Sequence, residues 1–193
     1  MNGSTPAVVV IDMQDAFFSS GPLAPRARDL AARCSELHHW AGRRGVPVFQ
    51  VRTEHLPDRS TWTLNMLEDD MGFLIAGDSD AQALPGLASD GAIEVVKTRD
   101  SAFHGTDFEN QLRARGIDLL IVAGVSTHTC VAATAADAYA HDFHVVLVED
   151  AIASHRPELH EPTLEMLCDE FRFRRLCTSD LLNGPDSLIS RTG

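Results

Sequence analysis

The sequence predicts an α/β fold: a single-domain, doubly wound, six-stranded and mainly parallel sheet with helices on both faces. Short apolar runs rich in β-branched residues alternate with segments whose apolar residues recur at helical spacing. These runs are continuous, which is typical of strands buried on both faces of a parallel sheet. A chain of 193 residues suffices for one hydrophobic core. We therefore expect one domain over residues 1–193, without a linker or an internal repeat.

The first half of the chain shows two strands and one long helix. The run AVVVID predicts a strand at Ala7–Asp12, and apolar residues at helical spacing predict a helix over Arg26–Arg44. Gly45 is a plausible stop for that helix, and PVFQVR predicts the second strand at Pro47–Arg52. The region Thr53–Asp90 shows few regular signals. Long irregular segments of this kind are often functional.

The second half continues the alternation of strands and helices. Each apolar run is followed by a helical pattern, and Gly116 is expected to close one of the helices. The predicted elements are the strand Ala92–Lys97, the helix Asp107–Arg115, the strand Asp118–Gly124, the helix Cys130–Ala140, the strand His144–Asp150, the helix Pro157–Glu170 and the strand Phe173–Thr178.

Composition excludes several classes of protein. The chain has 16 Lys+Arg against 28 Asp+Glu, a formal net charge of −12, which argues against nucleic acid as a partner. No apolar run reaches the ~18 residues of a transmembrane helix, and the N-terminus lacks the basic region of a signal peptide. We therefore expect no membrane association and a cytoplasmic protein with reduced thiols. No Cys-x-x-Cys pair occurs, so a thioredoxin-like or zinc-ribbon protein has no support.

Three reactive residues follow strands of the predicted sheet. Asp12 closes the first strand, Lys97 closes the third, and Cys130 follows the fourth by a short turn. Each has an ordinary structural interpretation: a turn acid, a lysine reaching solvent, or a small packing residue. Because ligands of such sheets bind at the carboxyl ends of strands, their shared edge favours a functional site.

Cys130 also occupies the predicted start of a helix. A helix N-terminus carries about half a positive charge and unpaired N–H groups. Both favour the thiolate, which is the reactive form of cysteine. The free N–H groups could also hold the oxyanion that forms when a thiolate attacks a carbonyl. The position therefore suits a nucleophile.

Three stretches resemble the isochorismatase-like cysteine hydrolase superfamily of nicotinamidases, N-carbamoylsarcosine amidase and streptothricin hydrolase-like amidases. They are VVVIDMQDAFF, VVKTRDSAFHGTDFENQLRARGIDLLIVAG and GVSTHTCVAATAADAYAHDFHVVLVEDAIAS, in this order. The resemblance spans nearly the whole chain. It implies a catalytic triad of Asp12, Lys97 and Cys130, and a cis peptide bond between Val125 and Ser126.

The resemblance also implies a mechanism. Asp12 takes the Cys130 proton and returns it to the leaving nitrogen, while Lys97 holds Asp12. The N–H groups of Ser126 and Cys130 form the oxyanion hole, and water hydrolyses the thioester. Family members that cleave the vinyl ether of isochorismate typically lack the cysteine, so Cys130 favours hydrolysis of C–N bonds. The family further implies a homo-oligomer, either a dimer or a tetramer.

One departure from the family concerns metal. Nicotinamidases carry an Asp-x-His…His site after the second strand, but here Thr53 replaces the aspartate and Arg59 stands near the second histidine. His55 alone is a poor ligand set, although Glu54 or Asp58 could substitute. We therefore expect no metal and no other cofactor, and nicotinamide is disfavoured as a substrate.

Aromatic and polar residues close to the three reactive positions are candidates for substrate binding. Some of them also have other interpretations. Phe17 and Phe103 could be core residues, and Gln14 could lie on the surface. His128 could instead be the base of a Cys–His pair. The candidates are Gln14, Phe17, Phe18, Trp62, Phe103, His104 and His128.

The leading functional hypothesis is a cysteine amidohydrolase that acts on a small amide, lactam, carbamoyl or ureido compound through a thioester. A metal-dependent, nicotinamidase-like deamidase is the second enzyme hypothesis. A non-catalytic binding protein on the same fold is a third, and it predicts that Cys130 is no more sensitive to alkylation than the other thiols. A thiol-redox sensor would require a resolving cysteine near Cys130, and none lies near in sequence.

Overall fold

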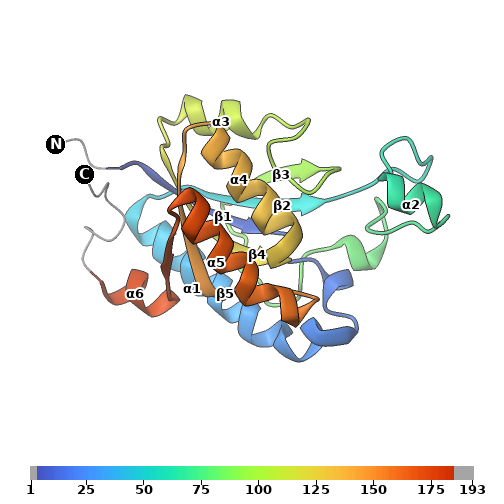
Figure 1. The fold of residues 1–193 in the computed structure, drawn as a ribbon, viewed down its shortest axis with the longest axis horizontal. Coiled ribbons are helices and arrows are strands. Elements are labelled where there is room, and N and C mark those ends of the chain that lie inside the picture. Colours follow the sequence, from blue (N-terminus) through green and yellow to red (C-terminus); the bar gives the residue numbers. More distant parts are fainter. Residues whose placement is uncertain (1–3, 185–193) are drawn as a thin grey trace.

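The structure, a computed structural model, describes residues 4–184 of the chain. A six-stranded sheet forms its centre, with the order β3-β2-β1-β4-β5-β6 and parallel pairing throughout (Figure 1). This arrangement confirms the predicted α/β fold. The strands are β1 (Pro6–Ile11), β2 (Val48–Thr53), β3 (Ile93–Lys97), β4 (Leu119–Val125), β5 (His144–Ala153) and β6 (Arg174–Leu176).

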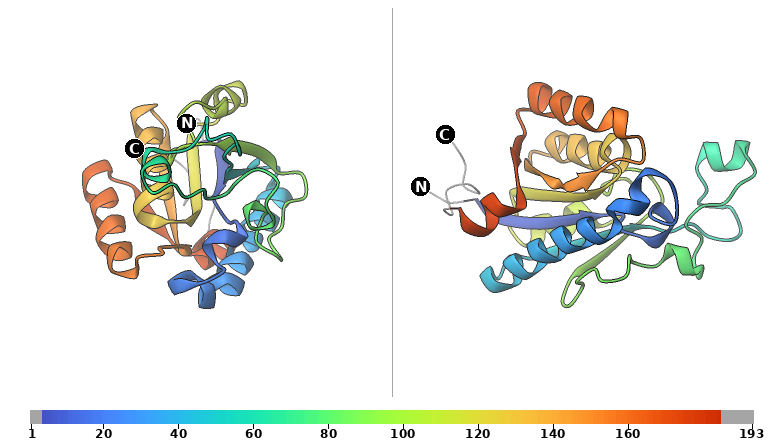
Figure 2. Two further views of the ribbon diagram at one scale, coloured as in Figure 1. Left: turned by 90° about the vertical axis from the view of Figure 1, so that its right-hand side faces the viewer. Right: turned by 90° about the horizontal axis from the view of Figure 1, so that it is seen from below.

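Helices cover both faces of the sheet. Figure 2 shows α1 on one side and α4 and α5 on the other. Two clusters of buried side chains correspond to these layers: one joins the sheet to α1 and α6, and the other joins it to α3, α4 and α5. The helices are α1 (Ala27–Arg44), α2 (Leu64–Glu68), α3 (Phe108–Ala114), α4 (Ala132–Ala140), α5 (His160–Phe171) and α6 (Thr178–Asn183).

The central strand β1 shows why the apolar runs are continuous. Ala7, Val9 and Ile11 belong to the cluster under α3, α4 and α5, whereas Val8 and Val10 belong to the cluster under α1. Successive strand residues point to opposite faces, and both faces are covered here. Every position of the strand is therefore apolar.

Several element boundaries differ from the prediction. The helix expected to start at Cys130 begins earlier, with a π-helical turn at Thr127–Val131 that leads into α4. β5 continues past its predicted end to Ala153. The sixth strand contains only Arg174–Leu176. A π-turn has no periodic signature in the sequence, which explains the first difference.

Some short elements were not predicted. Thr178–Asn183 forms α6, and the Asp180 carboxylate accepts a hydrogen bond from the Cys177 N–H group at its start (2.8 Å). Leu64–Glu68 forms α2 inside the region expected to be irregular, and Gly21–Arg26 forms a 3-10 helix ahead of α1. Elements this short contain too few turns to show a hydrophobic period.

The strand order reverses between β1 and β4, where the two backbones approach closely. Gly124 pairs with Ile11, and its φ is +114°. A Cβ atom at Gly124 would lie 2.0 Å from the carbonyl oxygen of Ile11. Only glycine fits both restrictions. This contact sets the ends of β1 and β4 beside each other.

Gly124→Ala is therefore expected to lower the free energy of unfolding by about 3 kcal/mol or more, through steric overlap and a disfavoured φ. Chemical denaturation monitored by circular dichroism measures this change. Gly42→Ala is the matched control, because Gly42 lies in α1 and a Cβ there would meet nothing within 4 Å. Similar stabilities of the two variants would contradict the interpretation of Gly124.

The buried thiol of Cys34 predicts a loss of stability at alkaline pH. Burial first, and Asp150 second, raise the pKa of Cys34 from 9.0 to about 12. The folded state keeps this proton where the unfolded chain releases it, so stability is full below pH 9 and falls as the pH rises toward 12. We expect a slope of about −1.4 kcal/mol per pH unit from this thiol. Denaturation of the wild type and Cys34→Ala between pH 8 and 11 should show a flatter slope in the variant, and equal slopes would contradict the assignment.

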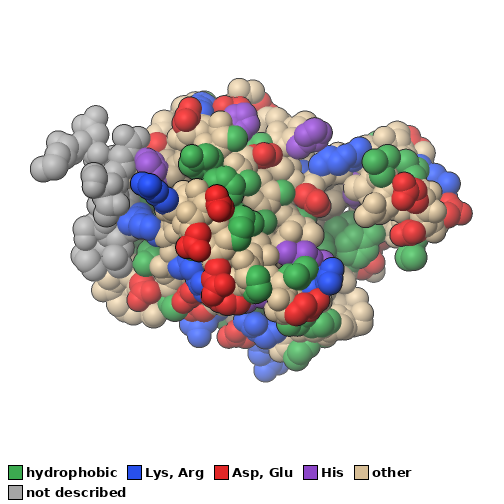
Figure 3. Space-filling model, in the orientation of Figure 1, with side chains coloured by type: hydrophobic (Ala, Val, Ile, Leu, Met, Phe, Trp, Pro, Cys, Tyr) green, Lys and Arg blue, Asp and Glu red, His purple; other side chains and the backbone are tan. Residues whose placement is uncertain are grey.

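Two properties of the structure concern the membrane-spanning and nucleic-acid-binding classes that the composition argues against. Among residues 4–184, no helix is both long enough and apolar enough to cross a membrane. Figure 3 shows acidic and basic side chains interspersed over one face of the molecule, without a continuous basic surface on that face.

Candidate active site

The three strand-end residues predicted to be catalytic lie together at the carboxyl edge of the sheet. Asp12 directly follows β1, Lys97 is the last residue of β3, and Cys130 lies in the π-turn after β4. The Nζ atom of Lys97 is 2.8 Å from Asp12 Oδ2 and 3.4 Å from Cys130 Sγ. One ammonium group thus contacts both other members of the predicted triad.

Thr53 connects the members of this group and was missed as a site residue. It ends β2 and pairs in register with Lys97 on β3. Its hydroxyl accepts a hydrogen bond from Lys97 Nζ (2.6 Å) and donates one to Asp12 Oδ1 (3.0 Å). In the sequence, Thr53 stands out only as the replacement for a metal ligand. Its position at the end of the intervening strand could have indicated this role.

The Lys97–Asp12 ion pair is completely buried, because both side chains are 0% exposed. Burial alone would lower the pKa of Lys97, but the charges of Asp12 and Cys130 and their hydrogen bonds outweigh it, so the pKa is raised. Lys97 is therefore an ammonium ion at neutral pH. Without it, the Asp12 carboxylate would be a buried and unpaired charge.

Cys130 differs from the expectation of a ready thiolate. Burial first, and the Asp12 charge second, raise the pKa of Cys130 well above its ordinary value, and Lys97 opposes this only in part. The side chain is buried, and the π-turn replaces the regular first turn of a helix. The resting sulfur is a thiol that needs a base.

The turn between β4 and α4 holds the predicted oxyanion donors. The peptide bond between Val125 and Ser126 is cis. The Ser126 carbonyl accepts N–H bonds from Thr129 (3.1 Å) and Val131 (3.2 Å), and its hydroxyl accepts one from the His155 N–H group (2.9 Å). These contacts fix the turn around the N–H groups of Ser126 and Cys130, whose role as oxyanion donors stays a prediction.

A further carboxylate lies beside the sulfur. Asp100 follows β3 on an exposed loop, and its Oδ1 atom is 3.7 Å from Cys130 Sγ. Asp100 is not among the predicted site residues, because an acid in a loop is usually solvated. Its place three positions after Lys97 is the one signal that could have found it.

Gln14 has a structural role at the end of β2. Its side-chain amide donates to the carbonyl groups of Thr53 (2.8 Å) and Ala81 (2.7 Å) and accepts from the Thr53 N–H group (2.8 Å). Gln14 is 1% exposed, so the alternative of a surface position is wrong. Its contact with substrate stays a prediction.

Phe18 and Phe103 both pack against the core. Phe18 is buried in the core cluster under α1. Phe103 is half-buried and packs against Phe108, Phe143 and His141, with ring centroids 5.0 to 5.9 Å apart. Their contact with substrate stays a prediction.

The other substrate-binding candidates remain predictions. Phe17 is half-buried and packs edge-to-face on Phe73 at 5.2 Å. Trp62 is half-buried, with Arg59 4.7 Å above its ring. His104 is exposed. His128 is half-exposed and bonds Ser154 Oγ through Nδ1 (2.9 Å), so the structure shows no Cys–His pair for it.

The residues of the nicotinamidase-type metal position do not form a ligand set. His55 is buried, and its Nδ1 atom bonds the carbonyl of Thr61 at 2.8 Å. Thr53 is engaged by Lys97 and Asp12. Burial lowers the pKa of His55, so its imidazole is neutral. The neighbouring Thr53 and Arg59 do not join it as metal ligands.

The charged residues of the same segment point to other partners. Glu54 pairs with Arg52, and Arg59 pairs with Asp70. Asp58 bonds the nearby Ser60. Within residues 4–184, no three His, Cys, Asp or Glu side chains converge on a point that could hold a metal ion. The residues present do not fit the metal of nicotinamidases.

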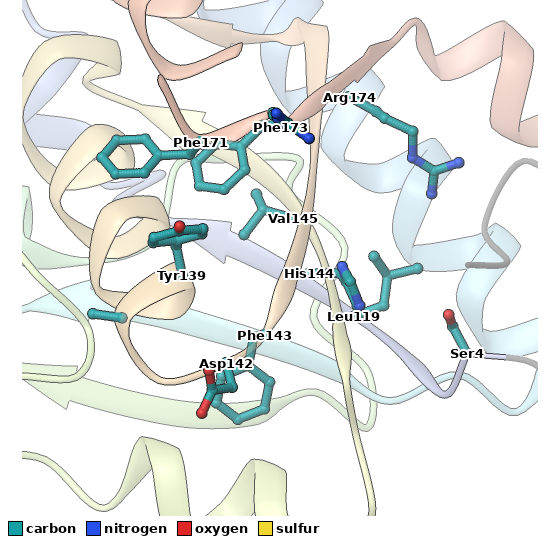
Figure 4. A pocket seen from close by; sticks show the side chains of 12 residues that line it. Ser4, Leu119, Tyr139, Asp142, Phe143, His144, Val145, Phe171, Phe173 and Arg174 are labelled. Carbon is teal, nitrogen blue, oxygen red and sulfur yellow. The ribbon is translucent and has the colours of Figure 1, made fainter. Parts of the chain in front are cut away.

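A further cavity lies away from this site. It measures about 700 Å³ and is lined by residues at the starts of β4 and β5 and around β6, including Leu119, Val145 and Arg174 (Figure 4). Tyr139 and Phe171 form part of its wall, with ring centroids 5.0 Å apart. This is the amino edge of the sheet, so the cavity does not belong to the site at Cys130.

Comparisons with known sequences identify the family. The family model described as "Isochorismatase domain" matches residues 6–179. An isochorismatase family protein of Escherichia coli O157:H7, YecD, whose name calls it uncharacterized, is 33% identical over 175 residues, which cover 85% of this chain and 88% of that one. A protein of Arabidopsis thaliana named "Probable inactive nicotinamidase" is 32% identical over 165 residues, 80% of this chain and 83% of that one.

A solved structure is also similar. The N-carbamoylsarcosine amidase of Thermoplasma acidophilum superposes with a TM-score of 0.78 at 26% identity, covering 90% of this chain and 96% of that one. These similarities extend over most of the fold, including all the strands whose ends form the site.

Proposed function

The chain belongs to the isochorismatase family of hydrolases, and we propose that it is a cysteine-dependent amidohydrolase that cleaves a C–N bond in a small amide, lactam, carbamoyl or ureido compound. One observation carries the proposal: the buried ammonium of Lys97 contacts both the Asp12 carboxylate and the Cys130 sulfur. A nucleophile, a base and the cation that orients them therefore share one point of the sheet edge.

In the proposed mechanism, Asp12 is the general base. It takes the proton of Cys130 as the sulfur attacks the carbonyl carbon, which gives a tetrahedral oxyanion. The protonated Asp12 then passes this proton to the leaving nitrogen, the C–N bond breaks, and a thioester remains. A water molecule, deprotonated by Asp12, attacks the thioester and releases the acid and the thiol.

The raised pKa of Cys130 fits this order of events. A thiol that stays protonated at rest loses its proton only when a base accepts it during the attack, which couples deprotonation to bond formation. Lys97 keeps Asp12 in place and stabilises the developing thiolate at 3.4 Å. Thr53 holds the other carboxylate oxygen of Asp12. The N–H groups of Ser126 and Cys130 are the proposed oxyanion donors.

The test is a panel of amides, lactams, carbamoyl and ureido compounds, followed by mass spectrometry of the acid-quenched protein. We expect turnover of at least one class and an acyl mass increase on the peptide that contains Cys130. Cys130→Ser is the matched variant, since it keeps a hydrogen-bonding group but not the thiol. Turnover with an acyl group on another residue would overturn the proposed nucleophile.

The metal-dependent alternative is tested on the same protein. The segment around His55 offers one histidine, a threonine and a cation, and zinc in a catalytic site usually has three protein ligands. We therefore expect elemental analysis to find no stoichiometric zinc, iron or manganese and chelation to leave turnover unchanged. One metal per chain, with turnover lost on its removal and regained on its return, would favour nicotinamidase-like deamidation.

A non-catalytic binding protein is the second candidate. Two observations favour it: a relative named as a probable inactive nicotinamidase, and the raised pKa of the Cys130 thiol. This candidate predicts that none of the panel compounds is turned over while some of them bind. Isothermal titration with the same panel separates binding from catalysis.

A further inference from the structure

The Asp100 carboxylate lies beside the Cys130 sulfur, and the proposed mechanism gives this carboxylate no role. Its Oδ1 atom is 3.7 Å from Cys130 Sγ, on the exposed side of the buried ion pair. An acyl group bonded to Sγ would therefore lie within a few ångströms of this carboxylate.

No cation offsets this carboxylate. Among residues 4–184, Asp100 forms no ion pair, and the neighbouring Arg99 directs its Nη1 atom to the carbonyl groups of Thr61 (2.8 Å) and Thr98 (2.6 Å). The buried charges of Lys97 and Asp12 offset each other. The charge left next to the sulfur is therefore negative.

Only the pKa of Cys130 agrees with this charge: burial and Asp12 raise it, and Asp100 adds to the rise. The pKa of His128 is lowered by burial, His155 and Arg156 against the opposing effect of Asp100. The His128 ring is thus neutral at pH 7 and supplies no positive charge to balance Asp100.

From this geometry we propose that Asp100 is a specificity-determining residue: it selects neutral or cationic amides and ureido compounds that present an N–H group beside the scissile carbonyl, and it excludes anionic acyl groups. The proposal rests on the proposed function of Cys130. A carboxylate accepts charge-assisted hydrogen bonds from such N–H groups. An anionic substrate would meet a like charge within a few ångströms, and selection against one class of ligand commonly works this way.

The test measures the charge preference of Cys130 without any substrate. Aminoethyl and sulfonatoethyl methanethiosulfonate are similar in size and opposite in charge, and each transfers its alkylthio group to a thiol with loss of methanesulfinate. Peptide mapping over time gives the rate constant of each reagent at Cys130. We expect the ratio of the cationic to the anionic rate constant to fall about tenfold in Asp100→Asn.

Asp142→Asn is the matched control, because it removes an exposed carboxylate beside the cavity at the opposite edge of the sheet. The ratio at Cys130 should stay unchanged in this variant. An unchanged ratio in Asp100→Asn, or an equal fall in both variants, would overturn the inference.

The two proposals fail separately. If Cys130→Ala retains turnover, the proposed nucleophile is wrong, while the reagent ratio still reports the effect of Asp100. If Cys130 is essential but the ratio does not change, only the role of Asp100 is wrong. If Cys130 reacts with neither reagent while the substrate panel is turned over, the role of Asp100 at the sulfur is wrong and the proposed nucleophile stands.

Discussion

Cys130→Ala is expected to reduce kcat on any identified substrate by at least about 10,000-fold, because no other group near the carbonyl could form the thioester. The fold should persist. Removing Sγ takes one atom from a buried site and ends its contacts with Lys97 and Asp100, so we expect the free energy of unfolding to change by less than about 1.5 kcal/mol. Steady-state kinetics and thermal denaturation measure the two quantities.

Cys34→Ala is the control for the loss of a thiol, since Cys34 lies in the core under α1. It should keep full turnover and lose stability. If Cys130→Ala keeps more than a tenth of the wild-type turnover, Cys130 is not the nucleophile.

Lys97→Met should give the second large effect, a loss of about 3–5 kcal/mol in the free energy of unfolding together with the loss of turnover. The substitution keeps the length of the side chain but leaves the Asp12 carboxylate buried without a cation. The double variant Asp12→Asn/Lys97→Met removes both charges and should regain much of that stability. Asparagine tolerates the φ of +50° at position 12.

Denaturant unfolding of the two single variants and the double variant completes the cycle. We expect a coupling energy of at least about 2 kcal/mol, with no recovery of turnover in the double variant. Additive losses of stability would show that the ion pair contributes no interaction energy, which contradicts the account of Lys97 given above. A turnover-competent double variant would remove Asp12 as the base.

The sequence alone predicted the fold and the three strand-end residues for a simple physical reason. Continuous apolar strands imply a covered parallel sheet, and parallel strands bring the residues that follow them to a common edge. Asp12, Lys97 and Cys130 each follow a strand, so their meeting needed no knowledge of side-chain packing. The same reasoning applies to Thr53 at the end of β2, but its neutral side chain carried no chemical signal of its own.

Properties that depend on packing could not be predicted. The position of Cys130 at a predicted helix start suggested a thiol with a lowered pKa. Burial and the Asp12 charge raise this pKa instead, and their effect is the larger one. Phe103 lies only a few positions after Lys97 in the sequence, yet the chain turns so that its ring packs near Phe143. Sequence proximity does not give the direction of a side chain.

The reactive group joins residues far apart along the chain: its contacts span 85 positions between Asp12 and Lys97 and 33 between Lys97 and Cys130. Closing loops of this length has an entropic cost that is recovered only when the intervening strands have paired. During refolding, catalytic competence should therefore arise late, after helical structure has formed. A partly folded chain would have a cysteine but no adjacent base, so its thiol would remain chemically ordinary until the sheet is complete.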